Sequence, residues 1–362
     1  MIAEGKFGTN EAVWFITIAI VAKVFYTSPA IVTGLVGTAG WYMTLISASV
    51  AVIGFTFIYL LLRRFPDKGL VEIYEIALGR IGGFVFSSML AILLIYIAAI
   101  RTREFSEVLK VYILPLTPLT YILILFLGTV ALLNLLGLET LARLSKLTGY
   151  TMVAGFIIVI LLGQQNYSFY RLFPILGYGI GKTLYNGIIR SSVYGEVICL
   201  AVFAPSLQGI KHIKKVGYTS LAFSGAFISL ALLAFIMTFP YYAAIEVTSP
   251  MYEMITLIDY GRFLQRVDPI FVFIMGISSL LSVSAVVCAF ISIYCKMFRI
   301  QDNKPVILPT GIIVYTMAIA SKSMSQITFG NVQALRDYGS IFFYILPLIA
   351  LIMAKLRKKG DA

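Results

Sequence analysis

The chain has 362 residues, of which 60% are hydrophobic and 12% charged, and its mean hydropathy is +0.95. A soluble domain carries about 25% charged residues, so this composition excludes water as the main solvent. The net charge of +12 does not indicate nucleic acid as a partner, because the Lys and Arg residues lie between apolar runs instead of lining one continuous surface.

Ten apolar runs follow one another along the chain. A hydrocarbon core about 30 Å thick needs about 20 apolar residues per spanning helix, so ten spans with short connections account for most of the sequence. The runs cover residues 13–35, 41–62, 83–100, 119–138, 144–162, 185–207, 218–239, 270–297, 306–320 and 338–353. We therefore predict an all-α integral membrane protein with ten transmembrane helices, forming a single transmembrane domain over 1–362.

The basic residues are divided unequally between the two sides that these spans imply. Most Lys and Arg residues lie in the connections on the side of the two termini, for example in 63–68 and 355–359. An excess of basic residues marks the cytoplasmic side, so both termini are predicted to be cytoplasmic. The start of the chain shows no small-residue cleavage site, so the first run is expected to remain as a span.

The first span is interrupted in its middle by Tyr26, Thr27, Ser28 and Pro29. Proline lacks a backbone donor and disfavours helical geometry in the residue before it, so the helix is expected to break there. Ser28 would be the N-cap of a second half-helix and Pro29 its first residue, and the free N–H groups at that end would bind a carboxylate. The alternative is a proline kink whose backbone groups are satisfied by neighbouring helices.

Two connections are expected to contain helices of their own. In 69–79 the apolar residues share one helical stripe, which predicts a cytoplasmic helix at the membrane interface. The external segment 241–268 predicts a short amphipathic helix, with Ser249 as its N-cap and Pro250 in its first turn.

Charged residues of opposite sign follow the third span at helical spacing. Such a pattern is typical of an ion-pair network in contact with water, here at the external face. The residues concerned are Arg101, Arg103, Glu104, Glu107 and Lys110.

The sixth span carries Tyr194, Gly195 and Glu196 ahead of a purely apolar run. A carboxylate at that depth costs about 2.5 to 3.5 kcal/mol on insertion scales, so Glu196 is expected to face a cavity or a partner, and Lys23 is the obvious partner. In one interpretation, Glu196 or the carbonyl groups near Tyr194 and Gly195 receive a ligand ammonium group, and protonation of Glu196 couples to the cycle. In the other, Lys23 and Glu196 form a structural pair.

The two interruptions fall in the first and sixth of ten spans. A five-plus-five inverted repeat places its two discontinuous helices there, around a central site. We predict repeats over about 1–163 and 185–356. Tyr96 in the third span and Ser282 in the eighth, beside Ser278, Ser279 and Ser284, are candidates to line this site, although small residues in spans also serve close packing.

Enzymatic chemistry is not indicated. The single histidine, His212, lies beside Lys211 and Lys214 in a basic connection without a positioned Ser or Cys. No nucleotide-binding or metalloprotease motif occurs, and the three cysteines lack metal-ligand spacing. We expect no enzyme activity, cofactor or metal.

Several stretches, taken in order, resemble the B subunit of GerA-type spore germinant receptors, which are spore germination permeases of the amino acid/polyamine/organocation transporter superfamily. The residues that carry the resemblance are Phe65-Pro66-Asp67-Lys68-Gly69, Leu78-Gly79-Arg80-Ile81-Gly82, Arg103-Glu104-Phe105, Thr117-Pro118, Tyr194-Gly195-Glu196, Phe239-Pro240, Phe263-Leu264-Gln265-Arg266-Val267-Asp268 with Ile270-Phe271, and Leu346-Pro347-Leu348 before Lys355 to Lys359.

The resemblance implies a LeuT-like fold and a site for a free amino acid between the first, third, sixth and eighth spans. It also implies assembly with an A subunit and a lipoprotein C subunit in the inner spore membrane. We expect a ligand-sensing subunit that binds a small molecule and contacts membrane lipid. The alternative is a proton-coupled amino-acid permease, with Lys146 or Glu196 titrating during the cycle. The expected location is the inner spore membrane or the cell membrane of a spore-forming bacterium.

Overall fold

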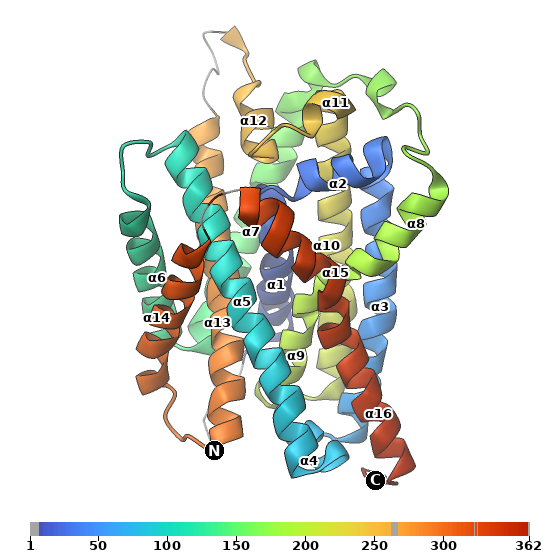
Figure 1. The fold of residues 1–362 in the computed structure, drawn as a ribbon, viewed down its shortest axis with the longest axis vertical. Helices are drawn as coiled ribbons and strands as arrows, with labels where there is room; N and C mark the ends of the chain where they lie inside the picture. The colour runs from blue at the N-terminus through green and yellow to red at the C-terminus, as the bar shows by residue number, and fades with distance from the viewer. Residues whose placement is uncertain (1–6, 262–266, 322, 324, 361–362) are drawn as a thin grey trace.

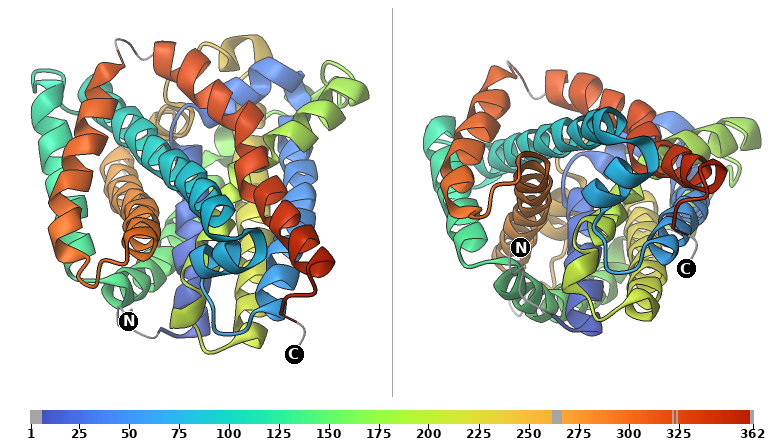
Figure 2. Two further views of the ribbon diagram at one scale, coloured as in Figure 1. Left: turned by 60° about the horizontal axis from the view of Figure 1, so that its bottom comes forward. Right: turned by 90° about the horizontal axis from the view of Figure 1, so that it is seen from below.

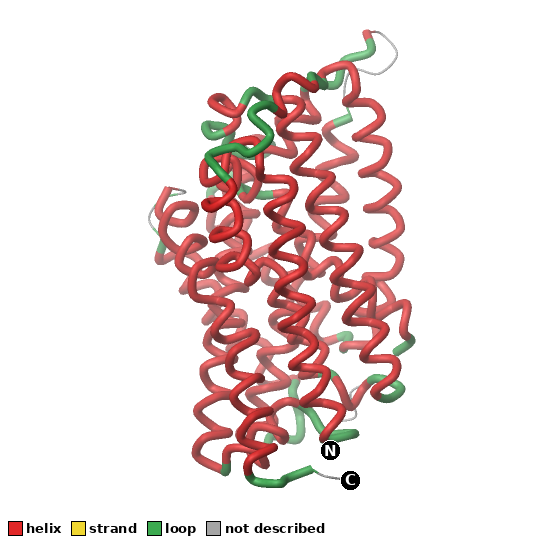
Figure 3. Tube along the Cα trace, turned by 90° about the vertical axis from the view of Figure 1, so that its right-hand side faces the viewer, coloured by secondary structure: helices red, strands yellow, loops and turns green. Residues whose placement is uncertain are grey.

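The computed structural model describes residues 7–261, 267–321, 323 and 325–360. Within these ranges the chain is helical and contains no strand, as the tube in Figure 3 shows. Residues 263–266 of the resemblance lie outside the described residues, as do the basic residues Lys6, Arg262 and Lys322.

Six helical stretches of the described chain are long and apolar enough to cross a membrane. They are Ser28–Arg64, Arg80–Tyr112, Leu138–Asn166, Ile210–Thr238, Asp268–Phe298 and Gln326–Leu356. Two shorter apolar helices, α6 (Leu119–Leu135) and α14 (Lys304–Ala320), have 17 residues each. Together with the interrupted first and sixth spans, they correspond to the ten predicted runs.

The uninterrupted long spans are α3 (Gly40–Arg64), α5 (Arg80–Tyr112), α7 (Leu138–Leu162), α10 (Ile210–Thr238) and α13 (Asp268–Phe298). The tenth span begins earlier than predicted, because twelve residues rich in polar side chains precede its apolar run at Tyr338 and are nevertheless helical. It consists of a wide π-helical turn η8 (Gln326–Asn331), α15 (Val332–Ser340), a second π-helical turn η9 (Ile341–Ile345) and α16 (Leu346–Leu356).

The first span is broken where proline predicts a break. It consists of α1 (Thr9–Val21), the 3₁₀ turn η1 (Ala22–Phe25) and α2 (Ser28–Val36), and α2 lies at a steep angle to α1 in Figure 1. Ser28 occupies the first turn of α2, while Thr27 stands at the N-cap position, one residue earlier than predicted. The Thr27 hydroxyl does not cap the helix, because it donates elsewhere.

The sixth span is interrupted over a longer stretch. Nine residues of 3₁₀ conformation, η5 (Arg190–Ile198), separate α8 (Ile180–Ile189) from the short α9 (Cys199–Val202). Because 3₁₀ geometry leaves backbone groups less well paired than an α-helix does, the segment that carries Glu196 is open to side-chain partners.

The connections contain short elements. A helix α4 (Leu70–Leu78) forms where an interfacial helix was predicted, and α12 (Pro250–Thr256) forms in the external segment, behind Ser249. Ser249 stands at the N-cap position but its side chain makes no capping hydrogen bond. The remaining short elements are η2 (Gly37–Ala39), η3 (Gly163–Asn166), η4 (Phe169–Leu172), η6 (Ala204–Ser206) and α11 (Tyr241–Ala244).

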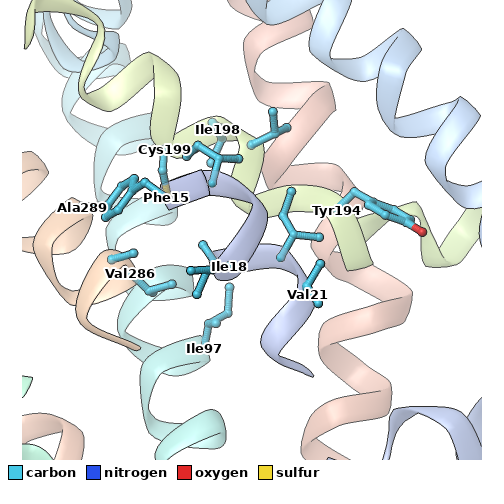
Figure 4. Packing of buried hydrophobic residues seen from close by; sticks show 14 of the residues in the cluster. Phe15, Ile18, Val21, Ile97, Tyr194, Ile198, Cys199, Val286 and Ala289 are labelled. Carbon is cyan, nitrogen blue, oxygen red and sulfur yellow. The ribbon is translucent and has the colours of Figure 1, made fainter. Parts of the chain in front are cut away.

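The interrupted first span lies inside the bundle. Residues 12–21 of α1 are all buried, and α1 packs against α7, α10 and α13, as the view from below in Figure 2 shows. In Figure 4, side chains of α1 meet those of three other spans, namely Phe15, Ile18 and Val21 with Ile97, Tyr194, Ile198, Cys199, Val286 and Ala289. This packing positions the two interruptions beside each other at the centre of the molecule.

Candidate functional site

Glu196 lies at the point where the two interrupted spans meet. Its side chain is fully buried in η5, and its Oε2 accepts a hydrogen bond from Lys23 Nζ of η1 at 2.6 Å. Its Oε1 accepts a hydrogen bond from the guanidinium of Arg101, which comes from α5. The predicted contact between Lys23 and Glu196 is therefore present, and a second cation completes it.

The two cations are also bound to the loosened backbone and to the eighth span. Lys23 Nζ donates to the carbonyl of Val193, and Arg101 Nη1 donates to the carbonyl of Ala19 at 2.9 Å and to Ser282 Oγ at 2.7 Å. A buried charge costs several kcal/mol unless such partners surround it. The cluster thereby joins the first, third, sixth and eighth spans.

The prediction of an ion-pair network in contact with water after the third span is wrong for Arg101, Arg103 and Glu104. Arg101, Arg103 and Glu104 are 3%, 6% and 4% exposed, because α5 continues as a helix to Tyr112 and keeps these residues inside the bundle. Arg103 does pair with Glu107 four residues on, at 2.8 Å. The spacing within one helix could not show that Arg101 faces Glu196 of another span.

Glu104 connects the third span to the first interruption. Its Oε1 accepts a hydrogen bond from the Thr27 hydroxyl at 2.8 Å, and both side chains are buried. Two carboxylates, Glu104 and Glu196, thus lie among the cations at the centre of the bundle. The sequence analysis did not assign Glu104 to the site.

Two cavities adjoin this centre, separated by α2 and α15. A small inner cavity of about 30 Å³ is lined by Lys23, Ser28, Pro29 and Arg336 among others, and it has room for about one water molecule. A larger outer cavity of about 690 Å³ is lined by Thr27, Ala30, Ile31, Gly34, Leu35, Ile245, Glu246, Val247, Thr248, Ser325, Thr328, Phe329, Gln333 and Asp337. Each of the two helices therefore lines the inner cavity with one face and the outer cavity with another.

Sequence reasoning missed Arg336, because the residue precedes the predicted tenth span, 338–353. It lies on α15 and is only 6% exposed. The signal that was available is its position two residues before the tenth apolar run, in a segment whose helical extent the apolar pattern alone could not define.

Tyr194 and Gly195 are buried beside Glu196 but face other spans. The Tyr194 hydroxyl donates to the carbonyl of Thr44 in α3 at 3.1 Å. A Cβ atom at Gly195 would overlap the ring of Phe343, so this glycine allows η9 to approach η5 closely. Both residues support the interruption in the sixth span through packing.

Two candidates lie away from the centre. Lys146 of α7 is 40% exposed and faces Glu11 Oε1 at 3.8 Å. Tyr96 is partly buried against the apolar core and lines neither the inner nor the outer cavity. Among the described residues, no group of His, Cys, Asp and Glu side chains could hold a metal ion.

Comparison with known sequences gives one consistent family. A sequence model of the family described as "Spore germination protein" matches residues 6–327. "Spore germination protein KB" of Bacillus subtilis (strain 168) is 25% identical over 331 residues, covering 89% of this chain and 88% of the relative. "Spore germination protein A2" of the same organism is 23% identical over 367 residues, covering 98% of this chain and 97% of the relative.

Comparison with solved structures shows the fold. Mhp1, a nucleobase-cation-symport-1 family transporter, superposes with a TM-score of 0.72 at 12% identity, covering 94% of this chain and 77% of that chain. MhsT in complex with L-phenylalanine superposes with a TM-score of 0.66 at 17% identity, covering 99% of this chain and 91% of that chain. The predicted LeuT-like arrangement of ten spans, with discontinuous first and sixth helices, is confirmed.

Proposed function

Because this chain belongs to the spore germination protein family, we propose that it is the amino-acid-sensing membrane subunit of a spore germination receptor, built on a transporter scaffold. The family and the apolar spans make it a germination-related integral membrane protein. Its relatives and structural neighbours are germination proteins and transporters, and it is not an enzyme.

The observation that carries the proposal is the meeting of two interrupted helices at a buried charged centre beside two cavities. Ser28 and Pro29, at the start of α2, line the inner cavity, and the N-terminal end of a helix suits a carboxylate. One structural neighbour, MhsT, is described in complex with L-phenylalanine, which supports a free amino acid as the ligand class.

The size of the inner cavity supports a sensing mechanism. At about 30 Å³ it cannot contain an amino acid, so binding at the inner cavity requires α2 or α15, which separate it from the outer cavity, to move. A ligand that fits only the opened arrangement shifts the population of conformations toward that arrangement. We propose that Lys23, Arg101 and Glu196 hold the closed arrangement, and that the change is passed to A and C subunits in the inner spore membrane.

A ligand screen on the purified chain tests this proposal. We expect at least one of the L-amino acids to raise the unfolding temperature in a concentration-dependent way, since a ligand that binds only the folded state stabilises it. Ser28→Phe, which fills the inner cavity, is expected to weaken this response at least about tenfold, equivalent to about 1.4 kcal/mol.

Ser49→Phe is the matched control, because Ser49 is an exposed serine on α3 that lines neither the inner nor the outer cavity. It should leave the response unchanged. The proposal is contradicted if no amino acid stabilises the protein, or if Ser28→Phe and Ser49→Phe give the same dose response as the unaltered chain.

A proton-coupled amino-acid permease is the second candidate. It is favoured by the likeness to symporters, among them a Na⁺-coupled sialic acid symporter with a TM-score of 0.70 at 13% identity. Glu196 or Lys146 would then titrate during transport. Liposomes containing the purified chain distinguish the two functions, because a permease accumulates labelled amino acid under a pH gradient, whereas a sensor binds the amino acid without accumulating it.

A further inference from the structure

The charges at the centre of the bundle do not balance. Two buried cations, Arg103 and Arg190, pair with Glu107 and Asp337. The other buried Lys, Arg, Asp and Glu side chains of the described residues are three cations and two anions. These are Lys23, Arg101 and Arg336 with Glu104 and Glu196. One positive charge is left over in a low-dielectric environment, where an uncompensated charge is costly.

Arg336 carries this surplus. Lys23 and Arg101 both contact Glu196 and backbone carbonyl groups, whereas the guanidinium of Arg336 donates no hydrogen bond to any described residue and has no carboxylate oxygen within 4 Å among them. Its Nη1 atom is buried without a partner. Buried polar groups are satisfied in the great majority of cases, so an unpaired guanidinium indicates a missing acceptor.

The two acids nearby already have other partners, Glu196 on both oxygens and Glu104 on Oε1. Both oxygens of Glu196 accept hydrogen bonds from Lys23 and Arg101, and Glu104 accepts one from Thr27. Arg336 interacts electrostatically with Glu196 and Glu104, but it forms no hydrogen bond or ion pair with either. In this arrangement no described residue supplies an acceptor for the N–H groups of Arg336, so a bound ligand can supply one.

Arg336 also lines the inner cavity. It shares the cavity wall with Ser28 and Pro29 at the start of α2 and with Lys23 of η1. A planar guanidinium matches the two oxygens of a carboxylate, and the N-terminal end of a helix favours negative charge. Arg336 and the start of α2 thus line the same small cavity from different spans.

We propose that Arg336 binds the carboxylate group of the ligand, opposite the start of α2, and that it makes the site selective for ligands that carry a carboxylate. This inference rests on the function proposed above. It assigns the anionic end of the ligand to α15, one of the two helices that separate the cavities, so that ligand binding would act directly on that helix.

The first test needs no ligand. Arg336→Gln removes an unpaired buried charge, so the unliganded variant is expected to unfold at the same temperature as the unaltered chain or at a higher one. Arg103→Gln is the matched control, because Arg103 is also 6% exposed but donates to Glu107 and to the carbonyl of Ala318. This control should unfold at a lower temperature than the unaltered chain, since the substitution removes the hydrogen bonds of Arg103 to Glu107 and Ala318.

The second test measures ligand selectivity by the shift in unfolding temperature. The probes are the L-amino acids, the carboxamide of each one that binds, and the corresponding carboxylic acid without the amino group. In the unaltered chain we expect the acid to bind at least about tenfold more tightly than its carboxamide. Arg336→Gln should reduce that ratio to about one. Arg336→Lys should give an intermediate ratio, because lysine keeps the charge without the planar guanidinium. The control Arg103→Gln should preserve the ratio of the unaltered chain.

The outcomes separate the two proposals. If an amino acid binds and the preference for the acid persists in Arg336→Gln, the role of Arg336 is refuted while the sensing function stands. A loss of stability in unliganded Arg336→Gln as large as in Arg103→Gln also refutes it. If neither amino acids nor carboxylic acids bind to the unaltered chain, both proposals fail.

Discussion

The ionic contacts of Glu196 show how single residues hold the centre of this protein. Its carboxylate accepts hydrogen bonds from Lys23 and Arg101, and both cations have further acceptors in the backbone. Removing one partner of such a buried group leaves the others with charge that nothing compensates. The contribution of each residue is therefore larger than that of an exposed ion pair with the same chemistry.

We predict that Arg101→Gln destabilises the protein by about 3–5 kcal/mol, the range found when one partner of a buried ion pair is removed. Arg143→Gln is the control, because Arg143 pairs with Glu139 on the surface of α7, where its side chain is 68% exposed. Exposed pairs contribute up to about 1 kcal/mol, so this control should change little. Unfolding of both variants in the same detergent compares them, and equal effects would refute the central role of the Glu196 cluster.

At the scale of elements, close contacts between spans depend on small residues facing large aromatic ones. A Cβ atom at Gly149 of α7 would overlap the indole of Trp14 in α1, and one at Gly217 of α10 would overlap the ring of Phe55 in α3. Helices in membranes gain their association from such close packing, because lipid is as apolar as the helix surfaces. Gly149 thus lets α7 approach the buried first span closely, and Gly217 does the same for α10 and α3.

Gly149→Val is predicted to destabilise the protein by about 1–3 kcal/mol, because the added side chain forces α7 away from α1. Gly128→Val on α6 is the control, since a Cβ atom there meets no other heavy atom within 4 Å. Thermal unfolding of the two valine variants measures the difference. Equal stability of the two would mean that α1 does not depend on this contact.

Also at this scale, α15 is bounded on both sides by π-helical turns, η8 and η9. Such turns are rare and are frequently found at functional sites. Arg190 attaches α15 to the sixth span, through Gln333 Oε1 at 2.6 Å and Asp337 Oδ1 at 3.1 Å. This helix is therefore a separate segment of the tenth span that the charged contacts of η5 position.

For the whole molecule, the described ends of the chain lie at one end of the bundle together with α4, and α11 and α12 lie at the other (Figure 1). The first of these ends also carries most of the basic connections counted in the sequence, such as 63–68 and 355–359. We propose that this end faces the cytoplasm. The boundaries of the two repeats, about 1–163 and 185–356, remain a prediction.

Cysteine labelling tests the orientation, in a background without Cys199, Cys288 and Cys295. A membrane-impermeant maleimide should label Tyr242→Cys on α11 in intact cells, and Lys358→Cys after α16 only once the cells are permeabilised. Both positions are exposed in the structure. Leu125→Cys in the middle of α6, where the leucine is 71% exposed on an apolar helix, should stay unlabelled in both conditions. Labelling of Lys358→Cys in intact cells would reverse the proposed orientation.

Sequence reasoning predicted the spans because each of them must satisfy the same local condition. Any helix that crosses hydrocarbon needs a long apolar run, and Pro29 interrupts such a run in a way that backbone chemistry makes visible. The depth of Glu196 likewise required a cationic partner, and Lys23 was identified. Boundaries were less certain where polar residues continue a helix, as in α5 beyond Ile100 and in the tenth span before Tyr338.

By itself, then, the sequence determined the membrane-spanning class, the number of spans and the positions of the two interruptions, since these follow from the composition of consecutive residues. Only the tertiary structure decided that Arg101 joins Lys23 on Glu196, that Glu104 faces Thr27, and that Arg336 reaches the inner cavity unpaired. Those contacts depend on the rotation and depth of each helix relative to the others. Helix packing sets both, and no spacing along one chain segment encodes them.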